Sequence, residues 1–91
     1  MRESKKYKIK IPKEYTFREW KNENNELHRV DGPAFEDSNK HQKWYMNGVL
    51  HRVDGPAIIF GKYEEFWFNG IKYSKEEYDN KIKTIKNLKK L

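Results

Sequence analysis

Apolar and polar residues alternate along much of the chain, which is typical of β-strands whose two faces meet different surroundings. The alternation is clearest on both sides of Asn69-Gly70. An Asn-Gly pair favours a two-residue hairpin turn, because this turn needs a positive φ at both central positions. The pattern therefore predicts a hairpin with Phe66 and Phe68 on one face and Trp67 on the other. The predicted partners across this hairpin are Phe66 and Tyr73, Trp67 and Lys72, and Phe68 and Ile71.

The same reasoning predicts two further hairpins and an edge strand. Asn47-Gly48 marks the turn of one hairpin, in which both faces carry apolar groups, so the sequence leaves its buried face open. Its predicted partners are Met46 and Val49, and Tyr45 and Leu50. The loop of the first hairpin, residues 22–25, is longer and lacks glycine, so its register is open. Residues 7–11 alternate and carry lysines, which suits an edge strand that must not aggregate.

The periodicity changes from strand to helix after Tyr73. Ser74 and Glu77 have the spacing of a capping box, in which each side chain accepts a hydrogen bond from the backbone N–H of the other. The apolar residues that follow at helical spacing are Tyr78, Ile82, Ile85 and Leu88. We expect one amphipathic helix from about Lys75 to about Lys89, docked on one face of the sheet. Which face it covers is open.

An internal repeat organises the middle of the chain. The octapeptide LHRVDGPA stands at residues 27–34 and again at residues 50–57, an offset of 23 residues. Residues 44–48 align with residues 67–70 when a gap of one residue is allowed, so Trp67 is interpreted as the repeat of Trp44. Trp20 lies 24 residues before Trp44. A fixed period of this size indicates stacked units that share their apolar faces with their neighbours.

These elements predict an α+β fold: a twisted antiparallel sheet that meanders through hairpins, with one C-terminal amphipathic helix packed on it. A chain of 91 residues is expected to form a single domain. Its parts are a basic N-terminal strand or arm (1–14), two to three 23-residue hairpin units (15–73) and the C-terminal helix (74–91).

The repeat resembles MORN repeats, which are hairpin units with a tryptophan and an Asn-Gly turn. The form NGxLHRxDGPA, present at residues 47–57, is more similar to repeat proteins encoded by bacteriophages and large DNA viruses. The resemblance covers about Tyr15 to Tyr78. It departs from standard MORN units, whose glycine-rich segment is replaced here by residues 51–55. MORN proteins share a scaffold for protein and lipid contacts rather than a reaction, so the resemblance implies a MORN-like binding scaffold.

Both copies of the octapeptide contain histidine, arginine and aspartate, three residue types that can take part in catalysis or binding. We interpret its polar and turn residues as a structural motif, in which aspartate caps the turn at a Gly-Pro corner, arginine pairs with this aspartate, and histidine packs on the tryptophan across the hairpin. The residues of this motif are His28, Arg29, Asp31, Gly32 and Pro33, and His51, Arg52, Asp54, Gly55 and Pro56. A catalytic site needs one copy and a nucleophile beside a base, whereas the motif is written twice. An enzyme that uses His51 and Asp54 is therefore the minority hypothesis, and no metal or cofactor is expected.

Four further residues are candidates for partner binding: Trp20, Trp44, Trp67 and Lys72. A row of tryptophans beside lysine and histidine can stack on nucleic-acid bases or hold a protein partner. The alternative is that the tryptophans form the core, because large rings supply most of the burial in a small domain.

The net charge of +6 is concentrated at the ends of the chain. Residues 1–13 hold six basic residues and one acid. Basic ends suit an anionic partner such as nucleic acid, although lysines also simply keep small proteins soluble. The candidate phosphate contacts are Lys81, Lys83, Lys86, Lys89 and Lys90. The sequence lacks cysteine, a membrane-spanning apolar run and a signal peptide, so we expect a cytoplasmic protein, of a host cell if viral.

Together these patterns predict a non-enzymatic binding protein. The viral character of the repeat favours a small phage-type accessory protein that binds and inhibits a host protein, such as a defence or transcription component. The alternative is an RNA- or DNA-binding protein that uses the basic N-terminal arm and the C-terminal helix. The sequence leaves homo-oligomerisation open.

Overall fold

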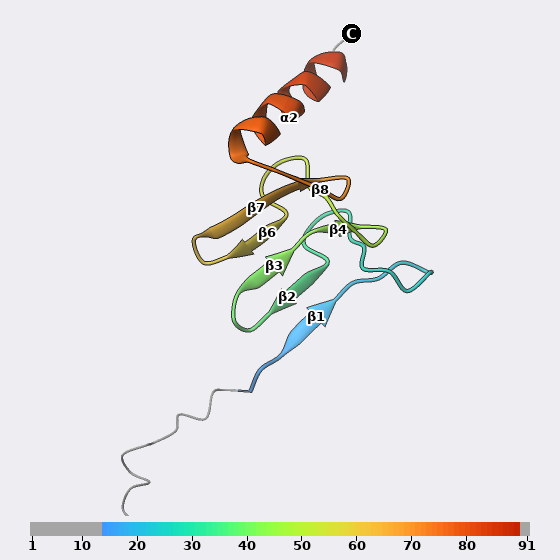
Figure 1. Ribbon diagram of the computed structural model, residues 1–91. Helices are drawn as coiled ribbons and strands as arrows, with labels where there is room; N and C mark the ends of the chain where they lie inside the picture. The colour runs from blue at the N-terminus through green and yellow to red at the C-terminus, as the bar shows by residue number, and fades with distance from the viewer. Residues whose placement is uncertain (1–13, 90–91) are drawn as a thin grey trace, which may run out of the picture.

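The computed structural model describes residues 14–89 and shows a six-stranded antiparallel sheet with a helix at one end (Figure 1). The sheet order is β1-β2-β3-β6-β7-β8. These strands are β1 (Phe17–Glu19), β2 (Phe35–Asp37), β3 (His41–Lys43), β6 (Ile58–Phe60), β7 (Tyr63–Phe68) and β8 (Ile71–Tyr73). A separate two-stranded hairpin, β4 (Tyr45–Met46) and β5 (Val49–Leu50), leaves the meander between β3 and β6. The predicted α+β meander is confirmed; the expected edge strand at 7–11 lies outside the described residues.

Both Asn-Gly turns adopt the predicted conformation. Asn47 and Gly48 have φ values of 49° and 83°, and Asn69 and Gly70 have values of 50° and 80°. Positive φ at both central residues defines the turn that matches the twist of a two-residue hairpin. The predicted partners across both turns are confirmed.

The third unit is aligned differently from the sequence prediction. The backbone N–H of Arg29 donates to Tyr45 O (3.2 Å), and that of Arg52 donates to Trp67 O (3.1 Å), so Trp67 occupies the place of Tyr45. The interpretation of Trp67 as the repeat of Trp44 is therefore wrong. The physical reason is that the third turn comes one residue early, which moves Phe66 into the place of Trp44.

A row of side chains runs across the sheet and alternates between large and small as far as Phe66. Backbone hydrogen bonds join Trp20 N to Ala34 O (2.9 Å) and Trp44 N to Ala57 O (2.7 Å). Ala34 and Ala57 are fully buried. Because residues opposite each other in neighbouring strands share a face, each alanine lies between aromatic neighbours. The row, in sheet order, is Trp20, Ala34, Trp44, Ala57, Phe66 and Tyr73.

Helix α2 (Lys75–Lys89) packs on the last two strands, β7 and β8 (Figure 1). Its buried residues Tyr78 and Ile82 form the core with Phe66, and Phe68, Tyr73 and Ile85 pack around them. The helix therefore covers the face that carries Phe66 and Phe68, which the sequence left open. The capping box is also confirmed, since Glu77 N donates to Ser74 Oγ (3.1 Å) and Ser74 N donates to Glu77 Oε1 (3.0 Å).

Candidate functional site

The arginine of each octapeptide, and not the histidine as the sequence predicted, is stacked over a tryptophan and closes the Gly-Pro corner. The Cζ atom of Arg52 is 3.8 Å from the centre of the Trp44 ring, its Nε donates to Asp54 Oδ1 (3.2 Å), and its Nη1 donates to Pro56 O (3.0 Å). In the first copy, Arg29 makes the same contacts with Trp20 (3.9 Å), Asp31 (3.3 Å) and Pro33 (3.1 Å). A guanidinium stacked on a ring gains cation–π attraction and packing at once.

The glycine of each octapeptide makes room for this arginine. A Cβ atom on Gly32 would lie 2.8 Å from Cζ of Arg29, and one on Gly55 would lie 3.0 Å from Cζ of Arg52. Gly55 also has a φ of 153°, a backbone conformation that residues with a side chain rarely adopt. The arginine packing therefore requires a glycine at this position.

The histidine of each octapeptide joins its hairpin to the next one. Nδ1 of His28 accepts a hydrogen bond from Asn47 N (2.9 Å), and Nδ1 of His51 accepts one from Asn69 N (2.9 Å). Parallel backbone bonds run from Gly48 N to Leu27 O (2.8 Å) and from Gly70 N to Leu50 O (2.9 Å). An accepting Nδ1 requires the neutral ring, and burial lowers the pKa of His51 below its ordinary value, which favours the same form.

This arrangement does not bring His51 and Asp54 together as a base and its orienting carboxylate. Nδ1 of His51 is bound to the backbone of the third hairpin, and the Asp54 carboxylate is bound to Arg52. Within residues 14–89, no three His, Asp or Glu side chains group closely enough to hold a metal ion. The ten residues of the motif thus make the same internal contacts twice.

One polar cluster outside the octapeptide was missed by the sequence reasoning. Asp37 accepts hydrogen bonds from Tyr15 OH (3.0 Å) and from the backbone N–H of His41 (2.9 Å) and Asn39 (3.0 Å), and its Oδ2 lies 2.9 Å from His41 Nδ1. Burial acts to raise the pKa of Asp37, but these hydrogen bonds outweigh it and lower the pKa below the usual value. The signal was present, because aspartate before Ser38-Asn39 is typical of a side-chain-capped turn.

The sheet face away from α2 carries four exposed aromatic side chains, two on each side of Asp37 and His41. Tyr15, Phe17, Phe60 and Tyr63 are 55%, 53%, 47% and 54% exposed, and we call these four residues the aromatic face. Strand register places three of them on one face, because the residues directly opposite each other across the sheet are Phe17, Asp37, His41, Phe60 and Tyr63. Tyr15 joins this face through its hydrogen bond to Asp37 and its ring contact with Phe17. The imidazole of His41 stacks on Phe60 with ring centres 4.0 Å apart.

The four candidates for partner binding are divided between the two faces. Trp67 and Lys72 lie on the same side as the aromatic face, where Glu65 accepts from Trp67 Nε1 (2.8 Å) and lies 3.5 Å from Lys72 Nζ. Trp20 and Trp44 lie on the opposite side, under Arg29 and Arg52. The structure therefore does not form a single row of three tryptophans.

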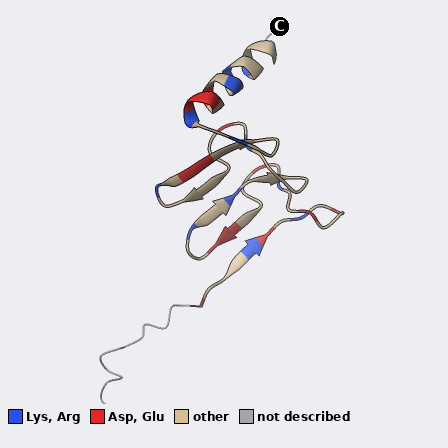
Figure 2. Ribbon diagram, viewed as in Figure 1, with Lys and Arg blue, Asp and Glu red and all other residues tan. Residues whose placement is uncertain are grey.

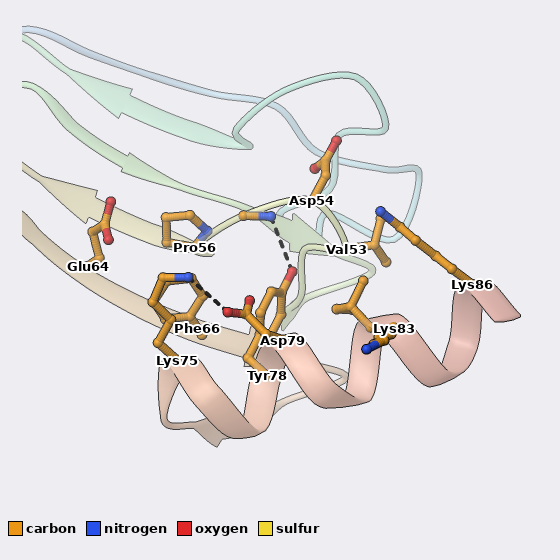
Figure 3. A pocket seen from close by; sticks show the side chains of 12 residues that line it. Val53, Asp54, Pro56, Glu64, Phe66, Lys75, Tyr78, Asp79, Lys83 and Lys86 are labelled. Atoms are coloured by element: carbon orange, nitrogen blue, oxygen red, sulfur yellow. Dashed lines mark hydrogen bonds and ion pairs between the residues drawn. The ribbon is translucent and has the colours of Figure 1, made fainter.

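The described lysines of α2 lie on two sides of the helix. Lys81 faces the sheet edge, with its Nζ 5.4 Å from the Phe68 ring and 5.7 Å from the Tyr73 ring. Lys83 and Lys86 line a groove on the other side, beside Val53 and Asp54 (Figure 3). Acidic residues occupy the first turn, and lysines follow along the helix (Figure 2). The Lys89 side chain and Lys90 lie outside the described residues. The helix thus presents no single stripe of candidate phosphate contacts among Lys81, Lys83 and Lys86.

Comparisons with protein-family models, curated proteins and solved structures gave no match. The MORN resemblance therefore stays a prediction, carried by the repeated octapeptide and the Asn-Gly turns alone. In the described part of the chain, no helix is both long and apolar enough to span a membrane.

Proposed function

We propose that this protein is a non-enzymatic binding protein that holds a protein partner on its aromatic face. The observation that carries the proposal is the set of four half-exposed aromatic rings on one side of the sheet, opposite the helix. Exposed apolar patches of this kind mark interaction sites, and aromatic side chains dominate the energetics of protein interfaces. The internal use of both octapeptides supports a scaffold rather than a catalytic role.

The charges around the aromatic face favour a protein over a nucleic acid. By strand register, Lys43 and Lys72 share the face with the carboxylates of Glu19, Asp37 and Glu65. A surface for single-stranded nucleic acid combines stacking rings with an excess of positive charge, because each phosphate must be neutralised. Rings surrounded by mixed charges fit the anatomy of a protein–protein interface instead.

The family resemblance supports a host protein as the partner. Repeat proteins of this form are encoded by phages and large DNA viruses, so we propose a small accessory protein that binds and inhibits a defence or transcription component in the host cytoplasm. Nucleic-acid binding through the basic ends is the alternative. The net charge of +6 supports it, whereas the division of the helix lysines between two sides does not.

A binding experiment with the purified partner tests the proposal. A partner captured from host lysate in the presence of nuclease is titrated against the wild type and against Phe60→Asp and Phe17→Asp. Each substitution is expected to weaken binding about thirtyfold or more, the size of an interface hot spot. Val30→Asp, at an exposed corner outside the aromatic face, is the control and should change binding less than about twofold.

The salt dependence separates the two functions. A protein interface with aromatic anchors should weaken little between about 50 and 500 mM salt, whereas phosphate binding falls log-linearly and steeply. Capture that nuclease abolishes, or an affinity that both aspartate variants leave unchanged while circular dichroism shows them folded, would overturn the proposal.

A further inference from the structure

A groove lies between α2 and the corner of the second octapeptide, next to the hydrogen bond that joins Tyr78 to Gly55 (Figure 3). Its volume of about 610 Å³ is in the range of ligand-binding clefts. The corner contributes Val53 and Asp54, and the helix contributes Ile82, Lys83 and Lys86. We call this the helix groove. It lies on the helix side of the sheet, so it is separate from the aromatic face.

The groove offers an apolar contact that the fold does not use. Val53 is 46% exposed at its edge, and Phe66 and Ile82 form its floor. In the octapeptide, the histidine, arginine and aspartate make hydrogen bonds within the protein, and the alanine is buried. The valine, in contrast, is exposed in both copies. A bulky apolar side chain from a partner would cover Val53 and the floor together.

The groove is positively charged at the end that lies beside the C-terminal half of α2. Lys75 is bound to Asp79 (2.9 Å) and Asp54 is bound to Arg52 (3.2 Å). Among the described residues, neither Lys83 nor Lys86 has a carboxylate within ion-pair distance. The remaining acid of the groove, Glu64, lies beside Lys75 at the other end. The groove therefore complements a ligand that is apolar at one point and anionic next to it.

We propose that the helix groove binds an acidic linear segment of a protein partner. An apolar side chain of the segment lies against Val53 and the floor, and neighbouring carboxylates pair with Lys83 and Lys86. The apolar contact supplies most of the affinity, and the two lysines select acidic over neutral segments. This second contact is independent of the partner on the aromatic face.

Selection from a random peptide library displayed on phage, with the full-length protein as bait, tests this proposal. The selected peptides should share a large apolar residue with Asp or Glu within a few positions. One synthetic peptide of this consensus is then titrated against variants at about 100 mM salt. Lys83→Glu combined with Lys86→Glu should weaken binding at least about tenfold, and Val53→Asp should do the same.

Each variant has a matched control in the chain. Lys81→Glu makes the same charge reversal at one position on the other side of the same helix, half the change of the double variant, and Val30→Asp alters the equivalent residue of the first octapeptide. Both should bind the peptide within about twofold of the wild type. Failure to select acidic peptides, or equal weakening by Lys81→Glu and by the Lys83→Glu and Lys86→Glu pair, would overturn the proposal.

Two further measurements keep the outcomes distinct. A thymidine oligonucleotide that displaces the peptide through Lys83 and Lys86 would show that the groove binds phosphates, which also overturns the proposal. Phe60→Asp should leave peptide binding unchanged, so failure at the groove and failure at the aromatic face are observed separately.

Discussion

The alanine that ends each octapeptide shows how narrowly single positions are determined in this fold. Ala34 and Ala57 are fully buried between aromatic neighbours in adjacent strands, next to corners that Arg29 and Arg52 close. A larger side chain would push the rings apart, and overpacking of this kind is destabilising. The repeat therefore requires a small residue at its last position, in addition to its polar residues.

His51 leads to a prediction about pH. Its lowered pKa means that the unfolded chain binds a proton more readily than the folded protein does. The contribution of His51 to stability is therefore complete above the ordinary histidine pKa and is lost as the pH falls through the lowered value. We expect urea unfolding to give a smaller free energy at about pH 5 than at about pH 7.5.

The variant His51→Asn isolates this contribution. The Asn Oδ1 atom can accept the hydrogen bond from Asn69 N but does not titrate. The variant should therefore lose less stability between the two pH values than the wild type. An equal loss in both proteins would show that His51 does not titrate with folding.

At the level of the elements, α2 supplies to the third hairpin what a further repeat would supply. The ring of Tyr78 lies 5.0 Å from that of Phe66, where Arg52 covers Trp44 in the unit before. The Tyr78 hydroxyl donates to Arg52 O and accepts from Gly55 N (3.2 Å). The helix thus ends the stack by binding the last corner.

Tyr78→Phe should weaken this junction. The substitution keeps the buried ring but leaves Gly55 N and Arg52 O without their partner, which costs about 1–3 kcal/mol of unfolding free energy. Tyr73→Phe is the control, because the hydroxyl of Tyr73 makes no hydrogen bond within the described residues, and it should cost less than about 0.5 kcal/mol. Chemical denaturation that finds the two variants equally stable would contradict this account of the junction.

Local signals predicted the elements, and non-local contacts decided the rest. The Asn-Gly turns and the capping box at Ser74 were correct, because each depends on a few consecutive residues. The face covered by α2 and the place of Trp67 depend on strand pairing far along the chain, which the repeat alone does not fix. The cluster at Asp37 was missed because its partners include Tyr15, which lies 22 residues earlier in the chain, beyond the first hairpin loop.

At the scale of the whole molecule, one side of the sheet is covered by other parts of the protein and the other side is exposed. One side is covered by α2 over β7 and β8 and by arginines over Trp20 and Trp44. The other side presents the aromatic face across β1, β6 and β7. Stacked hairpins thus form a scaffold that leaves one broad side free, and this division underlies the proposed binding function.

The scaffold depends on the histidines that join consecutive hairpins, and nuclear magnetic resonance measures those bonds directly. In the ¹⁵N-labelled protein near neutral pH, we predict a through-hydrogen-bond coupling between Asn69 N and His51 Nδ1, and another between Asn47 N and His28 Nδ1. Both Nδ1 atoms should have the chemical shift of an unprotonated nitrogen. Protonated Nδ1 atoms without either coupling would contradict the claim that the repeated octapeptide holds the stack together.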